Sequence, residues 1–218
     1  MAKDSIKLHL GNSSGLLDQQ EDKIRRAFDK ASDTCTHLLK LGRVDVMCWA
    51  DPRAVIPETG VGGYTPNRHL IQWTVDSSKD LDAGELYYTL CHEMNHARRY
   101  DGEGYGKTLF DSMVFEGLAT CFEGEVSGGK AMLYKYVTSY PDPKDLVTKY
   151  FLKHMDSTDF MYRDWFIRDP TELRPRWAGY IAGTYVIAEY MAAKNKTAPE
   201  LVLEASHDIR EFVRDTLG

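Results

Sequence analysis

The segment Cys91-His92-Glu93-Met94-Asn95-His96 contains two histidines four residues apart, with a glutamate directly after the first. On a helix, side chains at positions i and i+4 project from nearly the same side, so both imidazoles can reach one small cation. The glutamate lies at the flank of that face, where its carboxylate can take a proton from a metal-bound water. The spacing therefore predicts His92 and His96 as zinc ligands and Glu93 as the general base.

The competing explanation is an exposed helix turn with two solvated histidines, because so short a motif can arise by coincidence. Residues 85–99 fit one helix whose apolar positions recur on a separate stripe. The run just before the motif, residues 86–91, is apolar enough to be largely buried. Because His92 is then not expected to face bulk water, the sequence favours metal binding.

A catalytic zinc site commonly has three protein ligands and one open position. Glycines mark residues 102–106 as a loop, and residues 109–126 then fit a second helix. Glu116 lies in the middle of this helix, and folding the helix back against the first would bring its carboxylate to the histidines. We predict Glu116 as the third ligand, although an ordinary surface glutamate is the alternative. Gly117 is expected to let the two helices approach closely, and Glu123, further along the same face, to orient a histidine.

Other groups near the motif are weaker candidates for the ligand position. Glu103 lies in the glycine-rich loop, which is a poor place to fix ligand geometry, and Asp111 is a further competitor. Cys91 would point about 100° away from His92 on an ideal helix. The chain has four cysteines without paired metal-type spacing, which we expect to be reduced and mostly buried: Cys35, Cys48, Cys91 and Cys121.

Hydrolysis also calls for a donor to the negative oxygen of the tetrahedral intermediate, which a tyrosine hydroxyl can supply. Tyr180 is our prediction, because it opens a stretch, residues 179–183, whose glycines and alanine allow tight helix packing. A core tyrosine whose hydroxyl binds a nearby carbonyl is the competing explanation. Tyr105 and Tyr185 are further candidates.

Together these segments resemble a family of small, mostly bacterial zinc-dependent proteases of the gluzincin type. The resemblance spans most of the chain from about Val44 to Met191 and is carried by residues 61–66, 71–75, 89–98, 116–119 and 179–183. It implies a zincin-like fold, zinc held by His92, His96 and Glu116, and Glu93 as the base. It also implies that the substrate is a peptide or protein, whereas the residues alone indicate a zinc hydrolase.

Two other classes of function compete with a zinc metallopeptidase. One is a non-catalytic, zinc-binding or regulatory domain that keeps the peptidase fold. The intact Glu93 disfavours it, because metal binding alone does not need that carboxylate, and closed structural sites tend to use four protein ligands. The other is a helical interaction domain in which the motif is coincidental.

Composition limits the remaining possibilities. With 218 residues, of which 43% are apolar and 28% charged, the chain is expected to form one globular domain, residues 1–218. The net charge of −6 argues against a nucleic-acid partner. The sequence contains neither an apolar run long enough to cross a bilayer nor the apolar core of a secretion signal, so we expect no membrane association and a cytoplasmic location. The sequence gives no indication of the oligomeric state.

The sequence pattern of the elements around the site predicts an α+β fold. In this fold a small N-terminal sheet, antiparallel or mixed, packs on a mainly helical body. We expect strands at residues 44–50 and 69–75, a loop at 55–65, and one long helix or two at 16–41. Further helices are expected at 130–137, 144–155, 175–193, 198–205 and 208–217. Residues 69–75 are our candidate for a strand that pairs with an extended substrate, with residues 60–63 at the rim. The alternative is that this strand is paired on both sides and the loop merely connects.

Overall fold

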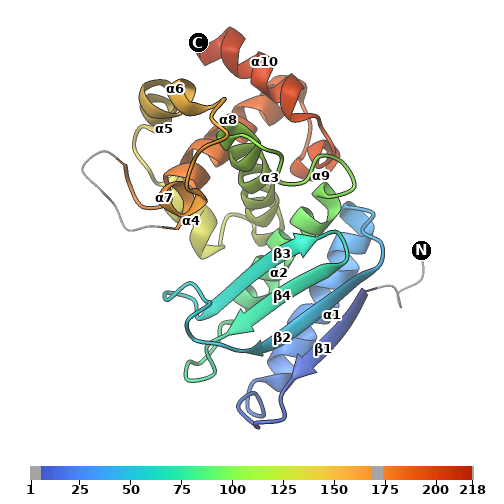
Figure 1. Cartoon of the computed structure of the whole chain (residues 1–218). Coiled ribbons are helices and arrows are strands. Elements are labelled where there is room, and N and C mark those ends of the chain that lie inside the picture. The colour runs from blue at the N-terminus through green and yellow to red at the C-terminus, as the bar shows by residue number, and fades with distance from the viewer. Residues whose placement is uncertain (1–5, 168–173, 218) are drawn as a thin grey trace.

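The computed structural model describes residues 6–167 and 174–217, which form a four-stranded sheet and a mainly helical remainder (Figure 1). The strands are β1 (Ile6–Gly11), β2 (Val44–Ala50), β3 (Val61–Asn67) and β4 (Leu70–Val75). Their order in space is β1-β2-β4-β3; β1, β2 and β4 run parallel, and β3 runs antiparallel to β4. The expected α+β class with a mixed sheet is confirmed.

β3 is an edge strand formed largely by residues for which the sequence predicted a loop. Two glycines and Pro66 lower the strand propensity of this segment, but a glycine in a strand also marks a place where another group approaches closely. A Cβ atom at Gly62 would overlap the main-chain oxygen of Ala54. The prediction that residues 69–75 offer an unpaired edge to a substrate is wrong, because β4 pairs with β2 on one side and β3 on the other.

Two helices lie against one face of the sheet (Figure 1): α1 (Glu21–Leu38) and α2 (Ala83–Arg99). α1 is shorter than the expected helix at 16–41. α2 begins at Ala83 because the Asp82 side chain accepts a hydrogen bond of 2.9 Å from the backbone N–H of Glu85. α2 packs against β3 and β4, so the histidine motif lies under the edge of the sheet.

The centre of the helical half is formed by α3 (Leu109–Ser127) and α8 (Ala178–Lys194). α3 packs on α2 and on α8, so it is the element that joins the two halves. A Cβ atom at Gly117 would overlap the main-chain oxygen of Gly183 in α8. The expectation that Gly117 lets α3 approach the first helix is therefore wrong, since this glycine faces α8.

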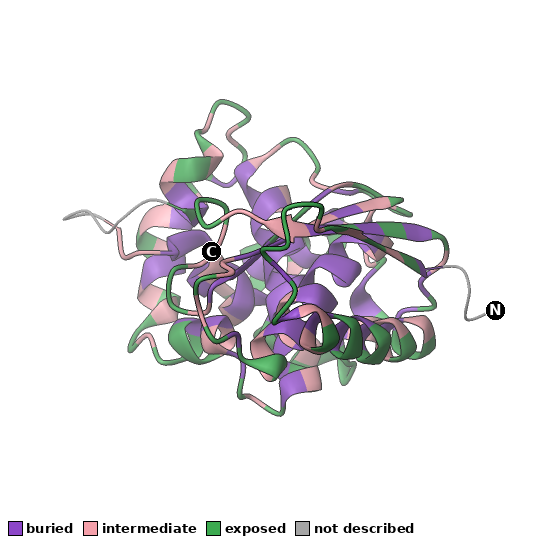
Figure 2. Ribbon diagram, turned by 90° about the horizontal axis from the view of Figure 1, so that it is seen from below, coloured by how far each residue is buried: buried purple, intermediate pink, exposed green. Residues whose placement is uncertain are grey.

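Shorter helical segments complete the described structure: α4 (Met132–Thr138), α5 (Pro143–Leu146), the π-helical turn η2 (Val147–Phe151), α6 (Leu152–His154), α7 (Tyr162–Phe166), α9 (Ala198–Leu201) and α10 (Ser206–Leu217). Figure 2 shows that buried residues concentrate between the sheet and the helices. Within residues 6–167 and 174–217, no helix is both long and apolar enough to span a bilayer.

Glu85, in the first turn of α2, joins this helix to α4. Its Oε1 atom accepts a hydrogen bond of 3.0 Å from the backbone N–H of Met132. Burial raises the pKa of Glu85 to about 7, and the nearby carboxylates of Glu123 and Asp82 act in the same direction. The ionised form of Glu85 therefore weakens the folded state.

Replacing Glu85 with glutamine, which keeps the acceptor oxygen and removes the charge, is expected to raise the melting temperature at about pH 8 by about 2–4 °C, equivalent to about 1 kcal/mol. The energy is kept this small because the Glu85 side chain is only partly buried, so water screens its charge. The pKa of Glu85 is 4.5 in the unfolded chain and about 7 in the folded protein. Because the folded-state pKa is the higher one, the carboxyl contributes its full stabilisation below pH 4.5 and loses it as the pH rises through about 7. Thermal unfolding of both proteins at about pH 4.5 and pH 8 measures this; an equal gain at both would contradict it.

Candidate metal centre

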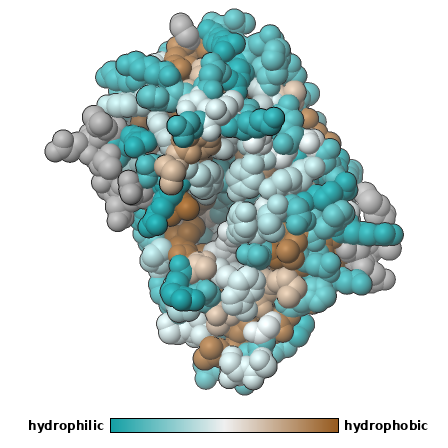
Figure 3. All heavy atoms as spheres, in the orientation of Figure 1, coloured by the Kyte–Doolittle hydropathy of each residue, from teal (hydrophilic) through white to brown (hydrophobic). Residues whose placement is uncertain are grey.

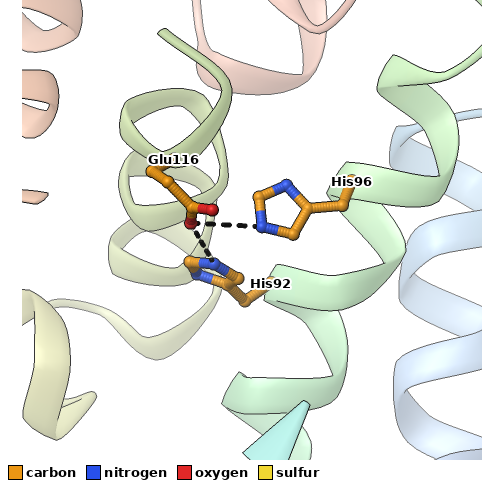
Figure 4. A group of neighbouring side chains, drawn as sticks. All are labelled: His92, His96 and Glu116. Atoms are coloured by element: carbon orange, nitrogen blue, oxygen red, sulfur yellow. Dashed lines mark hydrogen bonds and ion pairs between the residues drawn. The ribbon is translucent and has the colours of Figure 1, made fainter. Parts of the chain in front are cut away.

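The side chains of His92 and His96 on α2 and of Glu116 on α3 converge in the interior of the molecule (Figure 4). The Oε2 atom of Glu116 lies 3.3 Å from Nε2 of His92 and 3.2 Å from Nε2 of His96. The two imidazole rings are perpendicular, with centroids 4.7 Å apart, and all three side chains are buried. The structure thus brings together the three residues that the sequence predicted as zinc ligands.

The spacing of these atoms fits a zinc ion. Imidazole nitrogen and carboxylate oxygen are both zinc ligands, and ligand atoms about 2.0–2.1 Å from a tetrahedral ion lie about 3.3–3.4 Å apart. The two distances from Glu116 Oε2 are close to that separation. Two histidines and a carboxylate would give three protein ligands and leave one position for water.

Burial and neighbouring charges act in opposite directions on this cluster. Burial lowers the pKa of His92, but hydrogen bonding and the charges of Glu116 and Glu123 outweigh it and raise that pKa to about 10. Burial raises the pKa of Glu116, but the charge of His96 and hydrogen bonds from both histidines outweigh it and lower that pKa. Without a metal the cluster is therefore an ion pair between protonated His92 and ionised Glu116. Because zinc ligands must be deprotonated, a bound cation would take the place of that proton.

Both rings have further neighbours on α3. Nδ1 of His92 lies 3.4 Å from Oε2 of Glu123, which is where the sequence predicted an orienting carboxylate. The ring of His96 stacks on Phe115, with centroids 4.0 Å apart. Both imidazoles thus contact side chains of α3, the helix that also carries Glu116, although the Glu123 contact has the distance of an ion pair and not the geometry of a hydrogen bond.

Glu93 is buried beside the three converging side chains and close to β3. Its Oε2 atom accepts a hydrogen bond of 2.7 Å from Oγ1 of Thr65. Gly63 leaves room for the carboxylate, because a Cβ atom there would lie 2.6 Å from Oε1 of Glu93. Burial raises the pKa of Glu93, although the charges of the two histidines and the Thr65 hydrogen bond oppose the shift. The sequence placed Gly63 at the rim of the site, within residues 60–63, and Gly63 does line both cavities. Sequence reasoning missed the role of Thr65, because residues 55–65 were expected to form a loop.

Three tyrosines surround the Glu116 carboxylate. The hydroxyl of Tyr162 donates a hydrogen bond of 2.6 Å to Oε1, and that of Tyr105 lies 3.5 Å from the same atom. The ring centroid of Tyr180 on α8 is 6.3 Å from that of His92. Burial and the charge of Glu116 raise the pKa of Tyr180, so its phenol keeps a proton to donate. Sequence reasoning missed Tyr162, because the short helix α7 carries no clear periodic pattern.

Two cavities meet at Glu93 and Tyr180. The larger, of about 450 Å³, is lined by polar and aromatic side chains, among them Tyr64, His96, Tyr105, Glu116 and Tyr162. The other, of about 320 Å³, reaches His92 and has an apolar wall of Val55, Ile56, Leu133, Phe166 and Trp177. Figure 3 shows the surface hollowed in this region, between the sheet and the helical half. Tyr185 is not among the described residues that line either cavity.

The weaker ligand candidates are engaged elsewhere. Glu103 pairs with Arg99 at 3.3 Å and accepts a hydrogen bond from the backbone of Ser206. Asp111 accepts hydrogen bonds at the start of α3, where it completes a capping box with Thr108. All four cysteines are buried free thiols, as expected.

Residues 22–211 of this chain match the sequence pattern of a protein family described as Predicted Zn-dependent protease (DUF2268). The chain is a member of that family. The match includes α2, α3 and α8, and it confirms the resemblance to zinc-dependent proteases at the level of the family. No match was found among curated proteins or solved structures.

Proposed function

We propose that this DUF2268 protein is a gluzincin-type metallopeptidase with a zincin-like fold, which cleaves peptide bonds. His92, His96 and Glu116 would hold the zinc, and Glu93 would be the general base. The observation that carries the proposal is the meeting of three buried ligand atoms next to Glu93, at the point where two cavities join. The family description supports zinc dependence and proteolysis.

When bound, zinc would lower the pKa of a coordinated water to about 7 and polarise the carbonyl oxygen of the substrate. Glu93 takes the proton of the attacking water and passes it to the leaving amine nitrogen. Burial raises the pKa of this carboxyl, which helps it to hold the proton between the two transfers.

Tyr180 is the proposed donor to the oxygen that becomes negative. Its hydroxyl stays protonated, and its side chain lines both cavities. A neutral donor aimed at developing charge in a buried site lowers the barrier more than it would in water. Tyr162 has a different part: its hydrogen bond of 2.6 Å holds Oε1 of Glu116 and leaves Oε2 turned to the histidines.

β3 is the proposed binding edge for an extended peptide. β4 pairs with one side of β3, an isolated bridge joins Ile56 to Val61 at the start of the strand, and two later β3 residues, Gly63 and Tyr64, line the larger cavity. A peptide that adds to this edge gains backbone hydrogen bonds without a demand for particular side chains. The proposed partner is therefore a peptide or protein. The net charge of −6 argues against a nucleic-acid partner.

Metal analysis of the purified protein, together with hydrolysis of casein and of a mixed peptide library, tests this function. We expect about one zinc ion per chain and hydrolysis that a chelator abolishes and added zinc restores. Zinc without hydrolysis would favour the non-catalytic zinc-binding domain instead. A protein that binds no zinc would contradict both functions.

A further inference from the structure

We infer that Thr65 is a positioning residue, which holds the carboxylate of Glu93 in the orientation needed for proton transfer. This inference rests on the proposed role of Glu93 as the base. Thr65 lies in β3, 28 residues before Glu93, and belongs to neither the histidine motif nor the Glu116 segment.

Within residues 6–167 and 174–217, the Thr65 hydroxyl has two hydrogen-bonding contacts, both to Glu93. Oγ1 lies 2.7 Å from the carboxylate oxygen Oε2 and 3.1 Å from the backbone oxygen of the same residue. Carboxylate and carbonyl oxygens only accept, so the hydroxyl must be the donor. Thr65 is fully buried, at 0% exposure, so water does not compete for this hydrogen bond. A hydrogen bond to a charged acceptor of this kind is among the stronger ones in proteins.

The two oxygens of the Glu93 carboxylate have different surroundings. Gly63 and Thr65 are two residues apart in β3, so they face the same side of the strand. Thr65 holds Oε2, whereas Oε1 lies against Gly63, which has no side chain. Glu93 lines both cavities. One oxygen is thus fixed, and the other is left to accept a proton.

The backbone of β3 restricts the conformation of Thr65. Pro66 follows it, and a residue before proline is restricted to extended conformations. The pairing of β3 with β4 contains a bulge between Tyr64 and Asn67. Tyr64 pairs with Gln72 and Asn67 with Leu70, so β3 advances by three residues where β4 advances by two. Such bulges commonly redirect side chains next to active sites.

A purely structural role for Thr65 would depend on its shape, whereas a positioning role depends on its hydroxyl. Thr65→Val keeps the branched shape and removes the hydroxyl, and Thr65→Ser does the reverse. Thr184→Val is the matched control, because Thr184 in α8 is also a buried threonine but its Oγ1 has no hydrogen-bond partner among the described residues. If the valine variant does not fold, Thr65→Ala against Thr65→Ser gives the same comparison.

With zinc bound, we expect Thr65→Val to lower kcat by about 10–100-fold while KM and zinc content stay unchanged. Thr65→Ser and Thr184→Val should keep kcat within about threefold of the wild type, because neither removes the hydrogen bond. An unchanged kcat in Thr65→Val, or equal losses in the valine and serine variants, would overturn the inference.

Crystal structures of the metal-free proteins give a second readout that does not depend on activity. The Glu93 carboxylate should be in one conformation in the wild type and in Thr65→Ser, and displaced or split in Thr65→Val. An identical Glu93 conformation in the valine variant would overturn the inference whatever its kcat. If the wild type hydrolyses nothing, the proposed function is wrong, and this comparison alone decides whether Thr65 orients Glu93.

Discussion

Replacing Glu93 with glutamine is expected to lower kcat for peptide hydrolysis by on the order of 10³-fold. Glutamine keeps the shape of the side chain and an oxygen that can accept the Thr65 hydrogen bond of 2.7 Å. It cannot take a proton from water, so general base catalysis is lost. Because Glu93 is not among the three side chains that converge as ligands, the zinc content should stay at the wild-type level.

Glu125→Gln is the matched control for this experiment. Glu125 is an exposed glutamate, whose Oε1 accepts a hydrogen bond from the backbone N–H of Ala198, away from both cavities. Steady-state kinetics with zinc measured in the same samples should show a loss for Glu93→Gln and none for Glu125→Gln. Activity that survives in Glu93→Gln would assign the base elsewhere.

Replacing Glu116 with alanine is expected to weaken zinc binding by on the order of 10³-fold, because one of three ligands carries about a third of the roughly 12 kcal/mol typical of a tight zinc site. The same change at Glu123 should cost only about 10–100-fold, since Glu123 would orient His92 without contacting the metal. Both glutamates are buried on α3 and face the same histidine from opposite ring nitrogens.

Competition with a chromophoric chelator measures both affinities, and circular dichroism of the metal-free variants checks that each has folded. Because the two substitutions remove the same side chain from the same helix, their difference isolates the contact with the metal. Equal losses, or a greater loss at Glu123, would contradict the assignment of Glu116 as the ligand.

The parts of the site that were predicted from sequence share a local origin. His92, Glu93 and His96 are related by helical spacing alone, and α2 forms as predicted, two residues longer at its start. Glu116 and Glu123 lie on one face of α3 for the same reason, and the structure places both next to His92. A period of 3.6 residues is readable in any sequence, so these relations did not depend on knowing the fold.

The parts that escaped prediction depend on contacts between distant segments. β3 has weak strand propensity, and it forms because β4 supplies hydrogen-bond partners. Gly63, which lowers that propensity, leaves the space that Glu93 occupies. Thr65 and Tyr162 are ordinary residue types in unremarkable surroundings, and only the fold brings their hydroxyls to Glu93 and Glu116. β1, at Ile6–Gly11, was not predicted either, although its alternating apolar residues were a usable signal.

The crossing of α3 and α8 has a consequence for how reactivity could be altered. Gly117, next to Glu116, touches the backbone of Gly183, one helical turn from Tyr180. A methyl group added at Gly117 would force α3 and α8 apart. The carboxylate of Glu116 and the phenol of Tyr180 would then move apart, although neither side chain had been changed. Rate differences could therefore arise, by mutation or by design, from the size of a residue that meets neither solvent nor substrate.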